Sequence, residues 1–307
     1  MQLSVMLGNF RQPFLEALDS TQKLEIPAIH LSAIGEWDPS ICDAAARDAL
    51  KSTLRERNLK ISALSRWGGE VDLGDAEYHE RDIADAKRTL EMAADVMDGA
   101  PGIWQAHIGV IPHDMQGPRW DAFLKSCEEI AKHGEKVSAC LAIETGPEPA
   151  RVMEKLMETI DSPGLRVNYD PANLIIWPAL RHHRERLIEK YGKPETPYDP
   201  EEAVRNYEPV EGVKRLGRFT VHTHAKDAQV VDGIREEVPL GEGWVDWQRY
   251  LQLLQESGYD GYLAIEREAG DDAVGDISRA AEFLREQLRV LNSAPTKVLS
   301  AEASNVK

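Results

Sequence analysis

Four short apolar segments of the chain each end in a side chain that can bind a divalent metal. Glu144 ends the run LAIE, Asp170 ends LRVNYD, His224 ends FTVHTH and Glu266 ends GYLAIE. Three carboxylates and one imidazole are a donor set that suits Mn²⁺, Mg²⁺, Co²⁺ or Zn²⁺. The sequence therefore predicts a divalent-metal site, provided that the fold brings the ends of these four segments together.

The elements that must position these residues follow a regular alternation. Short apolar runs typical of buried strands alternate with longer amphipathic stretches typical of helices. The predicted strands are 2–6, 27–31, 60–65, 103–108, 138–144, 165–170, 218–224 and 261–266. The predicted helices are 12–24, 42–57, 79–98, 119–133, 150–160, 200–215, 246–257 and 273–291.

This alternation, with no break in composition, predicts an α/β fold: a single-domain (β/α)8 TIM barrel over residues 1–292. A doubly wound open sheet is the alternative, but the segment MLGNFRQPF after the first strand lacks a glycine-rich phosphate loop. In a barrel the fifth to eighth strands are neighbours, and their ends point into the mouth. The four candidate ligands would then form one arc there.

Two parts of the chain depart from this alternation of strands and helices. A long insertion after the sixth strand, at about 174–199, is punctuated by prolines. We expect it to be a lid over the mouth or a contact to a second copy of the chain. The protein is therefore a possible homo-oligomer. Residues 293–307 are predicted to be a frayed C-terminal tail.

Composition excludes several classes of protein. The net charge of −17 repels nucleic-acid backbones, so we expect no nucleic-acid partner. The chain has no run of roughly 18 apolar residues that could span a membrane, and its first residues do not resemble a signal peptide. Cys42, Cys127 and Cys140 are widely spaced, which is typical of reduced thiols. We therefore expect a cytoplasmic protein.

Several polar and aromatic residues are candidates for substrate contact. His107 ends the fourth strand and would face the mouth as a hydrogen-bond donor. Arg66 and Trp67 follow the third strand, where they suit a sugar face or a carboxylate. Lys226 suits an anionic group, and Trp177 in the insertion could form an apolar wall. His222 lies one layer deeper than His224 and is expected to support the site.

The segments IET, NYDPAN, HTHAKD, PLGEGWVDW and YLAIERE, in this order, resemble those of the sugar isomerase/epimerase superfamily with a xylose-isomerase-like barrel. The resemblance covers about residues 1–290. It implies that Glu144, Asp170, His224 and Glu266 are metal ligands. It also implies that Glu144 and Glu266 match the acid/base pair of the related ketose 3-epimerases. The implied activity is isomerisation or epimerisation of a sugar or polyol through a metal-stabilised enediolate.

Three positions depart from the ketose 3-epimerase pattern. Asn173 stands where those enzymes usually have a histidine, and Ala150 stands where they have a second glutamate, with Glu148 nearby. Val230 replaces an expected arginine, for which Arg235 could substitute from the same loop. Asn173 and Arg235 are therefore candidate substrate contacts, and a simple ketose 3-epimerase is disfavoured.

Three other functions compete with a sugar isomerase/epimerase. A metal-dependent lyase, either a dehydratase or a deglycosidase, could act on a keto-sugar or keto-inositol with the same residues. An endonuclease-IV-like phosphodiesterase would need a histidine-rich zinc site and a basic surface, and the sequence indicates neither. A non-catalytic sugar-binding barrel is the third. A small carbohydrate is the expected ligand, and the lack of a phosphate cradle favours a free or oxidised sugar.

Overall fold

The structure is a computed structural model that describes residues 1–97, 99–183, 185–191 and 199–293. Residues 294–307 of the predicted tail, and 184 and 192–198 of the predicted insertion, lie outside the described residues.

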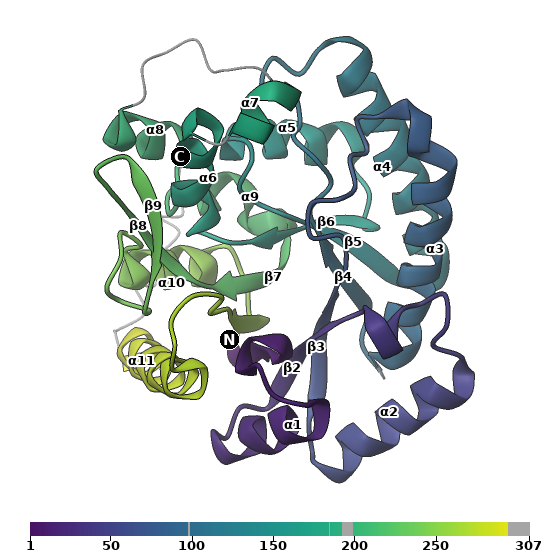
Figure 1. Cartoon of the computed structure of the whole chain (residues 1–307), viewed down its shortest axis with the longest axis vertical. Coiled ribbons are helices and arrows are strands. Elements are labelled where there is room, and N and C mark those ends of the chain that lie inside the picture. The colour runs from purple at the N-terminus through teal and green to yellow at the C-terminus, as the bar shows by residue number, and fades with distance from the viewer. Residues whose placement is uncertain (98, 184, 192–198, 294–307) are drawn as a thin grey trace, which may run out of the picture.

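Eight parallel strands close into a barrel in the order β1, β10, β7, β6, β5, β4, β3, β2 (Figure 1). Pairing of the first strand with the last closes the barrel, which confirms the predicted fold and rejects the open sheet. The strands are β1 (Gln2–Met6), β2 (Ala28–Ser32), β3 (Lys60–Ser65), β4 (Gly102–Ala106), β5 (Ala139–Glu144), β6 (Leu165–Tyr169), β7 (Thr220–Ala225) and β10 (Tyr262–Ile265).

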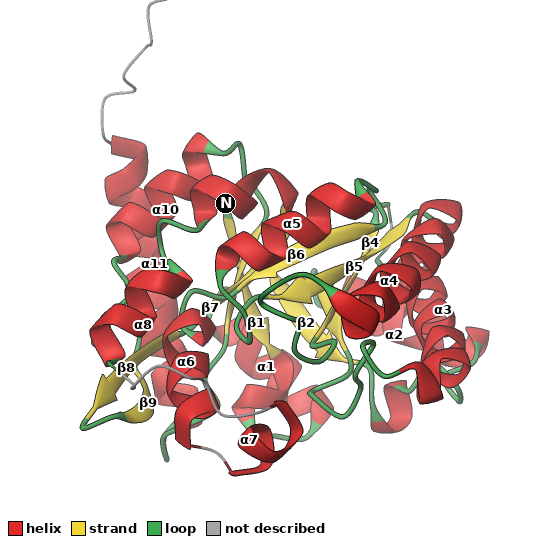
Figure 2. Ribbon diagram, turned by 90° about the horizontal axis from the view of Figure 1, so that it is seen from above, coloured by secondary structure: helices red, strands yellow, loops and turns green. Residues whose placement is uncertain are grey.

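Helices surround the barrel, as Figure 2 shows from above. They are α1 (Phe14–Lys23), α2 (Ala44–Glu56), α3 (His79–Val96), α4 (Gly117–Val137), α5 (Ala150–Ile160), α10 (Trp247–Glu256) and α11 (Ala273–Ser293). Asp43 and Asp246 cap α2 and α10 by accepting hydrogen bonds from backbone N–H groups of the first turn. Among the described residues, none of these helices is both long and apolar enough to cross a membrane.

The connection between β6 and β7 differs from prediction. It contains α6 (Asn173–His183), α7 (Glu185–Tyr191), α8 (Pro200–Tyr207) and α9 (Val213–Leu216). The single helix predicted over 200–215 is wrong. Glu208 precedes a proline and adopts a left-handed conformation with φ of 57°, so the helix ends there.

A second difference is a two-stranded antiparallel hairpin after β7, which was not predicted. It comprises β8 (Asp227–Val231) and β9 (Ile234–Val238). Asp232 and Gly233 form its turn, and both have positive φ angles, as a tight hairpin turn requires. The hairpin projects from the mouth of the barrel beside α6 (Figures 1 and 2).

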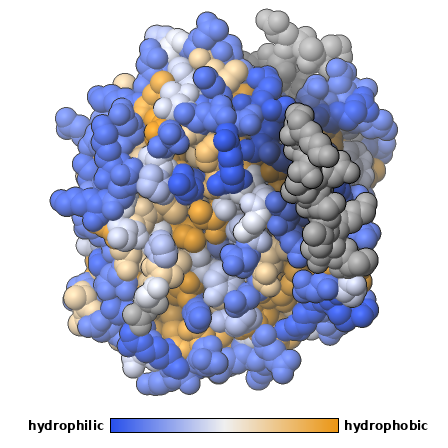
Figure 3. All heavy atoms as spheres, turned by 180° about the vertical axis from the view of Figure 1, so that it is seen from behind, coloured by the Kyte–Doolittle hydropathy of each residue, from blue (hydrophilic) through white to orange (hydrophobic). Residues whose placement is uncertain are grey.

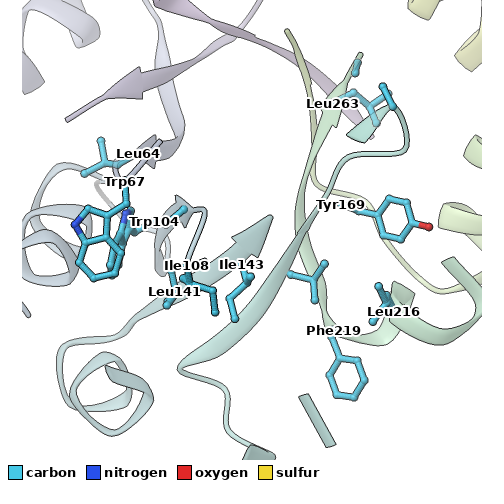
Figure 4. Close-up of a cluster of buried hydrophobic side chains, with 14 of the residues drawn as sticks. Leu64, Trp67, Trp104, Ile108, Leu141, Ile143, Tyr169, Leu216, Phe219 and Leu263 are labelled. Carbon is cyan, nitrogen blue, oxygen red and sulfur yellow. The ribbon is translucent and has the colours of Figure 1, made fainter. Parts of the chain in front are cut away.

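The apolar core lies between the strands and the helices, and Figure 4 shows part of it. Successive side chains of a strand face opposite sides, so Leu141 and Ile143 pack outward while Glu144 points inward. The barrel interior, in contrast, is polar. Its fully buried side chains include Ser4, His30, Ser62, Asn168 and His222.

The opposite end of the barrel also has a concave surface, and Ser62 of the polar interior is among the residues that line it. A broad depression of about 1160 Å³ lies at the amino ends of the strands, and Met97, Ile103, Val221 and Tyr262 are among its lining residues. Figure 3 views the molecule from behind and shows hydrophobic residues in the middle of a hydrophilic rim. Barrel enzymes carry their active sites at the carboxyl ends of the strands, so the candidate site is expected at the end opposite to this depression.

Candidate metal centre

The four candidate ligands meet at the carboxyl ends of their strands. Glu144 ends β5, Asp170 directly follows β6, His224 lies in β7 and Glu266 directly follows β10. One donor atom from each lies within 4.8 Å of the others. Nδ1 of His224 is 2.7 Å from Oε1 of Glu144 and 2.8 Å from Oε2 of Glu266. The structure therefore brings together all four residues that the sequence predicted.

Unpartnered atoms within this group fit a cation. Asp170 Oδ2, His224 Nδ1 and Glu266 Oε2 are buried and form no well-aligned hydrogen bond with the described residues. Burying several carboxylates together is costly unless a positive charge compensates them. Three carboxylate oxygens and one ring nitrogen are ligands that a hard divalent ion accepts. The residues present thus suit the predicted metal.

Neighbouring side chains hold Glu144 in place. Its Oε2 accepts a hydrogen bond of 2.6 Å from Gln105 Nε2 and lies 2.8 Å from His107 Nε2. Its Oε1 accepts a hydrogen bond of 3.1 Å from Asn173 Nδ2. Two of the predicted substrate contacts, His107 and Asn173, therefore also orient a predicted ligand.

The start of α6 holds Asp170. Its Oδ1 accepts hydrogen bonds from the backbone N–H groups of Ala172 at 2.8 Å and Asn173 at 3.0 Å. This arrangement satisfies N–H groups that a helix start leaves without partners. These bonds fix one carboxylate oxygen. The other, Oδ2, is left on the side of the remaining candidate ligands, where it could bind the same ion.

His224 is supported from the floor of the barrel by a residue that the sequence analysis missed. Its Nε2 lies 3.2 Å from Nδ1 of His30, a fully buried residue of β2. Next to this pair, His222 hydrogen-bonds Asn168 Oδ1 through Nδ1 and Ser62 through Nε2, at 2.8 and 3.1 Å. A polar residue inside the apolar run PAIHL was the available signal for His30.

The charges around the two terminal glutamates are not equivalent. Burial raises the pKa of Glu266, but Lys226 and His224 outweigh burial and lower it to about 2. Nζ of Lys226 lies 3.4 Å from Glu266 and 3.1 Å from Glu268. Burial raises the pKa of Asp170 to about 6. Burial raises the pKa of Glu144 as well, but His107 and His224 outweigh burial and lower it well below its ordinary value, so the surroundings keep both glutamates ionised.

A cavity of about 490 Å³ opens above these residues. All seven predicted substrate contacts line it, together with Glu144, His224 and Glu266: Arg66, Trp67, His107, Asn173, Trp177, Lys226 and Arg235. Their groups are not equally available. Arg66 pairs with Asp38 and Asp85 at 2.9 and 2.8 Å, and Trp67 Nε1 also donates to Asp85.

The family model for the xylose isomerase-like TIM barrel matches residues 16–287. The chain belongs to this family.

Relatives and solved structures agree with this assignment. The chain is 27% identical to an uncharacterized protein of Methanocaldococcus jannaschii over 72% of this chain and 68% of that one. It is 33% identical to L-ribulose-5-phosphate 3-epimerase UlaE of Escherichia coli, but over only 22% of this chain and 24% of the epimerase.

Among solved structures, the xylose isomerase domain protein from Planctomyces limnophilus superposes with a TM-score of 0.71 at 22% identity, covering 95% and 97% of the chains. A protein described as the probable 3-DHS dehydratase AsbF from Bacillus anthracis superposes with a TM-score of 0.68 at 15% identity, covering 93% and 99%. At these identities the superpositions show the shared fold.

Within this family fold, Asp227 explains why the segments HTHAKD and PLGEGWVDW occur together. Its carboxylate accepts hydrogen bonds from backbone N–H groups of Gly241 and Val245 and from Trp247 Nε1, at 2.9, 3.2 and 2.9 Å. A Cβ atom at Gly243 would collide with Asp227 Oδ1. Asp227 thereby ties the hairpin and the following turn to β7, one residue beyond Lys226.

Glu148 follows Glu144 by four residues and is not among the described residues that line the cavity. It is buried, its Oε2 has no hydrogen-bond partner among the described residues, and burial raises its pKa to about 8. The segment ETGPEP placed a second acid close to Glu144, and the structure buries that acid instead of exposing it to the cavity.

Proposed function

We propose that the protein is a divalent-metal-dependent isomerase or epimerase that acts on a sugar or polyol. One observation carries this proposal: Glu144 and Glu266 approach Nδ1 of His224 from different strands, and both line the cavity. A sugar in this cavity meets two carboxylates, one of which can take a proton from carbon while the other returns one.

The residues divide the reaction between them. Glu266, which Lys226 and His224 keep ionised, takes the proton from the carbon next to the sugar's carbonyl group. Burial lowers the pKa of His107, but Glu144 outweighs burial and raises it, so the His107–Glu144 pair holds a proton. Glu144 passes that proton on from His107, 2.8 Å away: to the opposite face of the same carbon in epimerisation, or to the neighbouring carbon in isomerisation.

Glu144, Asp170, His224 and Glu266 would hold the ion, which we take to be Mn²⁺, Mg²⁺, Co²⁺ or Zn²⁺. When bound, the ion supplies Lewis-acid polarisation of the substrate's carbonyl oxygen. Gln105 and Asn173 keep Glu144 oriented during this step, because each donates a hydrogen bond to one of its two oxygens.

The decisive test follows deuterium incorporation from D₂O into a panel of ketoses and keto-polyols. The metal-loaded protein should exchange a carbon-bound hydrogen, and chelator treatment should abolish exchange until Mn²⁺ or Co²⁺ is restored. Glu266→Gln should lower the exchange rate by about 10²–10⁴-fold. Glu16→Gln, an exposed acid on α1, is the matched control and should leave it unchanged. Full exchange by the chelated protein would refute metal dependence.

A lyase acting on a keto-sugar or keto-inositol is the second candidate. The proton held between His107 and Glu144 could protonate a departing hydroxyl group, and a solved structural neighbour is described as a probable dehydratase. The same panel separates the two reactions by mass. Loss of water marks elimination, whereas deuterium uptake in a product with the substrate's heavy atoms marks isomerisation or epimerisation.

A further inference from the structure

We infer that the substrate is an uncharged, unphosphorylated sugar whose end farthest from the metal centre meets an apolar wall. The inference rests on the proposed function for the place where the sugar's reacting carbon lies. The support for an uncharged substrate comes from the charges and side chains that line the rest of the cavity.

The cations that line the cavity are mostly engaged by acids. Arg66 is held by Asp38 and Asp85, and its side chain is only 14% exposed. Lys226 is 5% exposed and pairs with both Glu266 and Glu268. A phosphate dianion bound here would have to displace carboxylates from these cations, and strong phosphate sites instead keep several donors directed at the ligand.

The remaining lining cation, Arg235, lies on β9 and precedes two acids. Glu236 and Glu237 are its neighbours in sequence; Glu237, which pairs with Arg267 at 2.9 Å, lines the cavity with Glu70 and Glu268. Glu268 is 64% exposed at the mouth. An anionic ligand approaching the cavity therefore passes a rim of carboxylates, on a molecule whose net charge is −17.

The helix start at the cavity is also occupied. Helix N-termini are common phosphate sites because their backbone N–H groups point outward. At the start of α6, the N–H groups of Ala172 and Asn173 already donate to Asp170. The helix therefore supports the metal centre and does not offer these donors to a phosphate.

The same helix supplies an apolar wall. Ile176, Trp177 and Leu180 of α6 line the cavity, and Ile34 lines it from the connection after β2. Trp177 stands edge-on to His107, with ring centroids 6.1 Å apart, and Gly146 allows it to pack closely because a Cβ there would collide with the indole. This surface suits the C–H face of a sugar ring or an uncharged substituent.

The volume agrees with a ligand larger than a single small ring. Cavities of about 300–1,000 Å³ bind drug-sized ligands, and this one measures about 490 Å³. Because the lining cations and the helix start are engaged, the inferred substrate differs in charge from that of the Escherichia coli relative, which is named for a sugar phosphate.

Matched substrate pairs test this inference. The metal-loaded protein is given free ketopentoses and ketohexoses and the terminal phosphate of each, and exchange from D₂O gives kcat/KM. We expect kcat/KM to be at least tenfold higher for the free sugar of each pair. An equal or higher value for the phosphates would overturn the inference. If neither form of any sugar exchanges, the proposed function fails, and the Kd values of the same pairs, from calorimetric titration, decide the charge preference alone.

A pair of variants tests the physical cause. Glu268→Gln removes one of the two carboxylates that engage Lys226, so the preference for the free sugar should narrow at least threefold. Glu16→Gln removes one negative charge far from the mouth and should leave the preference unchanged. Equal preferences in the native protein and in Glu268→Gln would show that this ion pair does not exclude phosphate and would overturn that step.

Discussion

Replacing His30 by leucine should weaken divalent-metal binding by about 10–100-fold, although His30 is not itself a predicted ligand. His224 presents Nδ1 to the three carboxylates, and its Nε2 faces Nδ1 of His30 at 3.2 Å. A neutral imidazole that binds a metal through Nδ1 carries its hydrogen on Nε2. That N–H therefore needs His30 as its acceptor.

The size of the effect follows from burial. Both histidines are buried, so water cannot replace the lost acceptor. A buried donor without a partner costs about 1–3 kcal/mol. Since about 1.4 kcal/mol is a factor of ten in affinity, the loss corresponds to about 5- to 150-fold, a range that contains the expected 10–100-fold. Leucine nearly fills the volume of histidine, so packing should be little disturbed.

Calorimetric titration of the chelator-stripped protein with Mn²⁺ measures the effect directly. His30→Asn places Oδ1 where Nδ1 was and should recover most of the affinity. His133→Leu, on α4 and outside the cavity, is the control and should bind as the native protein does. Urea unfolding without metal verifies that each variant folds. The reasoning is refuted if a folded His30→Leu variant binds Mn²⁺ as tightly as the native protein, or if asparagine rescues nothing.

Three further outcomes follow from the geometry. The raised pKa of Glu148 favours folding fully below pH 4.5, and this contribution is lost as pH rises to about 8. Glu148→Gln should therefore gain stability over the native protein across that window, by at most about 5 kcal/mol in urea unfolding; a pH-independent difference would contradict this. Asp227→Asn should cost about 2–4 kcal/mol in the same assay, because the amide donates where Trp247 also donates. Gly146→Ala should raise KM, since its Cβ displaces Trp177, and should also lower the free energy of unfolding, because Gly146 has a φ of 152°; an unchanged KM would exclude that contact from binding.

The barrel and its four candidate ligands could be predicted because two periodic signals coincide. Strands such as β5 alternate outward apolar and inward residues, and polarity at their ends marks the mouth. Glu144 and Glu266 stand at such ends, so a shift of one or two residues in a strand boundary did not matter. His30 carried no comparable signal, because its role depends on a residue of β7 that is 194 positions away.

Helix α6 and the hairpin β8–β9 were not predicted because of residues within these segments. Pro178 lies inside α6. A proline at this position predicts the end of a helix, yet α6 continues through it. The hairpin β8–β9 did have a usable signal, since Asp232-Gly233 between β-branched residues favours a two-residue turn. Half of the residues in its two strands are polar, and this composition made them resemble a loop.

These two elements also explain how chemistry and selectivity separate in this chain. The predicted metal ligands sit on barrel strands whose hydrogen bonds fix them on both sides. The wall and the charged rim come from α6 and from β9, which supply Trp177, Arg235 and Glu237 to the cavity. Because none of the wall residues Ile176, Trp177 and Leu180 is a predicted ligand, exchanging them should alter which sugar is accepted without removing a metal ligand. Ile176→Asp should therefore lower kcat/KM for sugars with apolar substituents more than for small polar ones, while the Kd for Mn²⁺ stays within about threefold of the native value. A larger loss of metal affinity would show that the wall and the centre are one coupled unit.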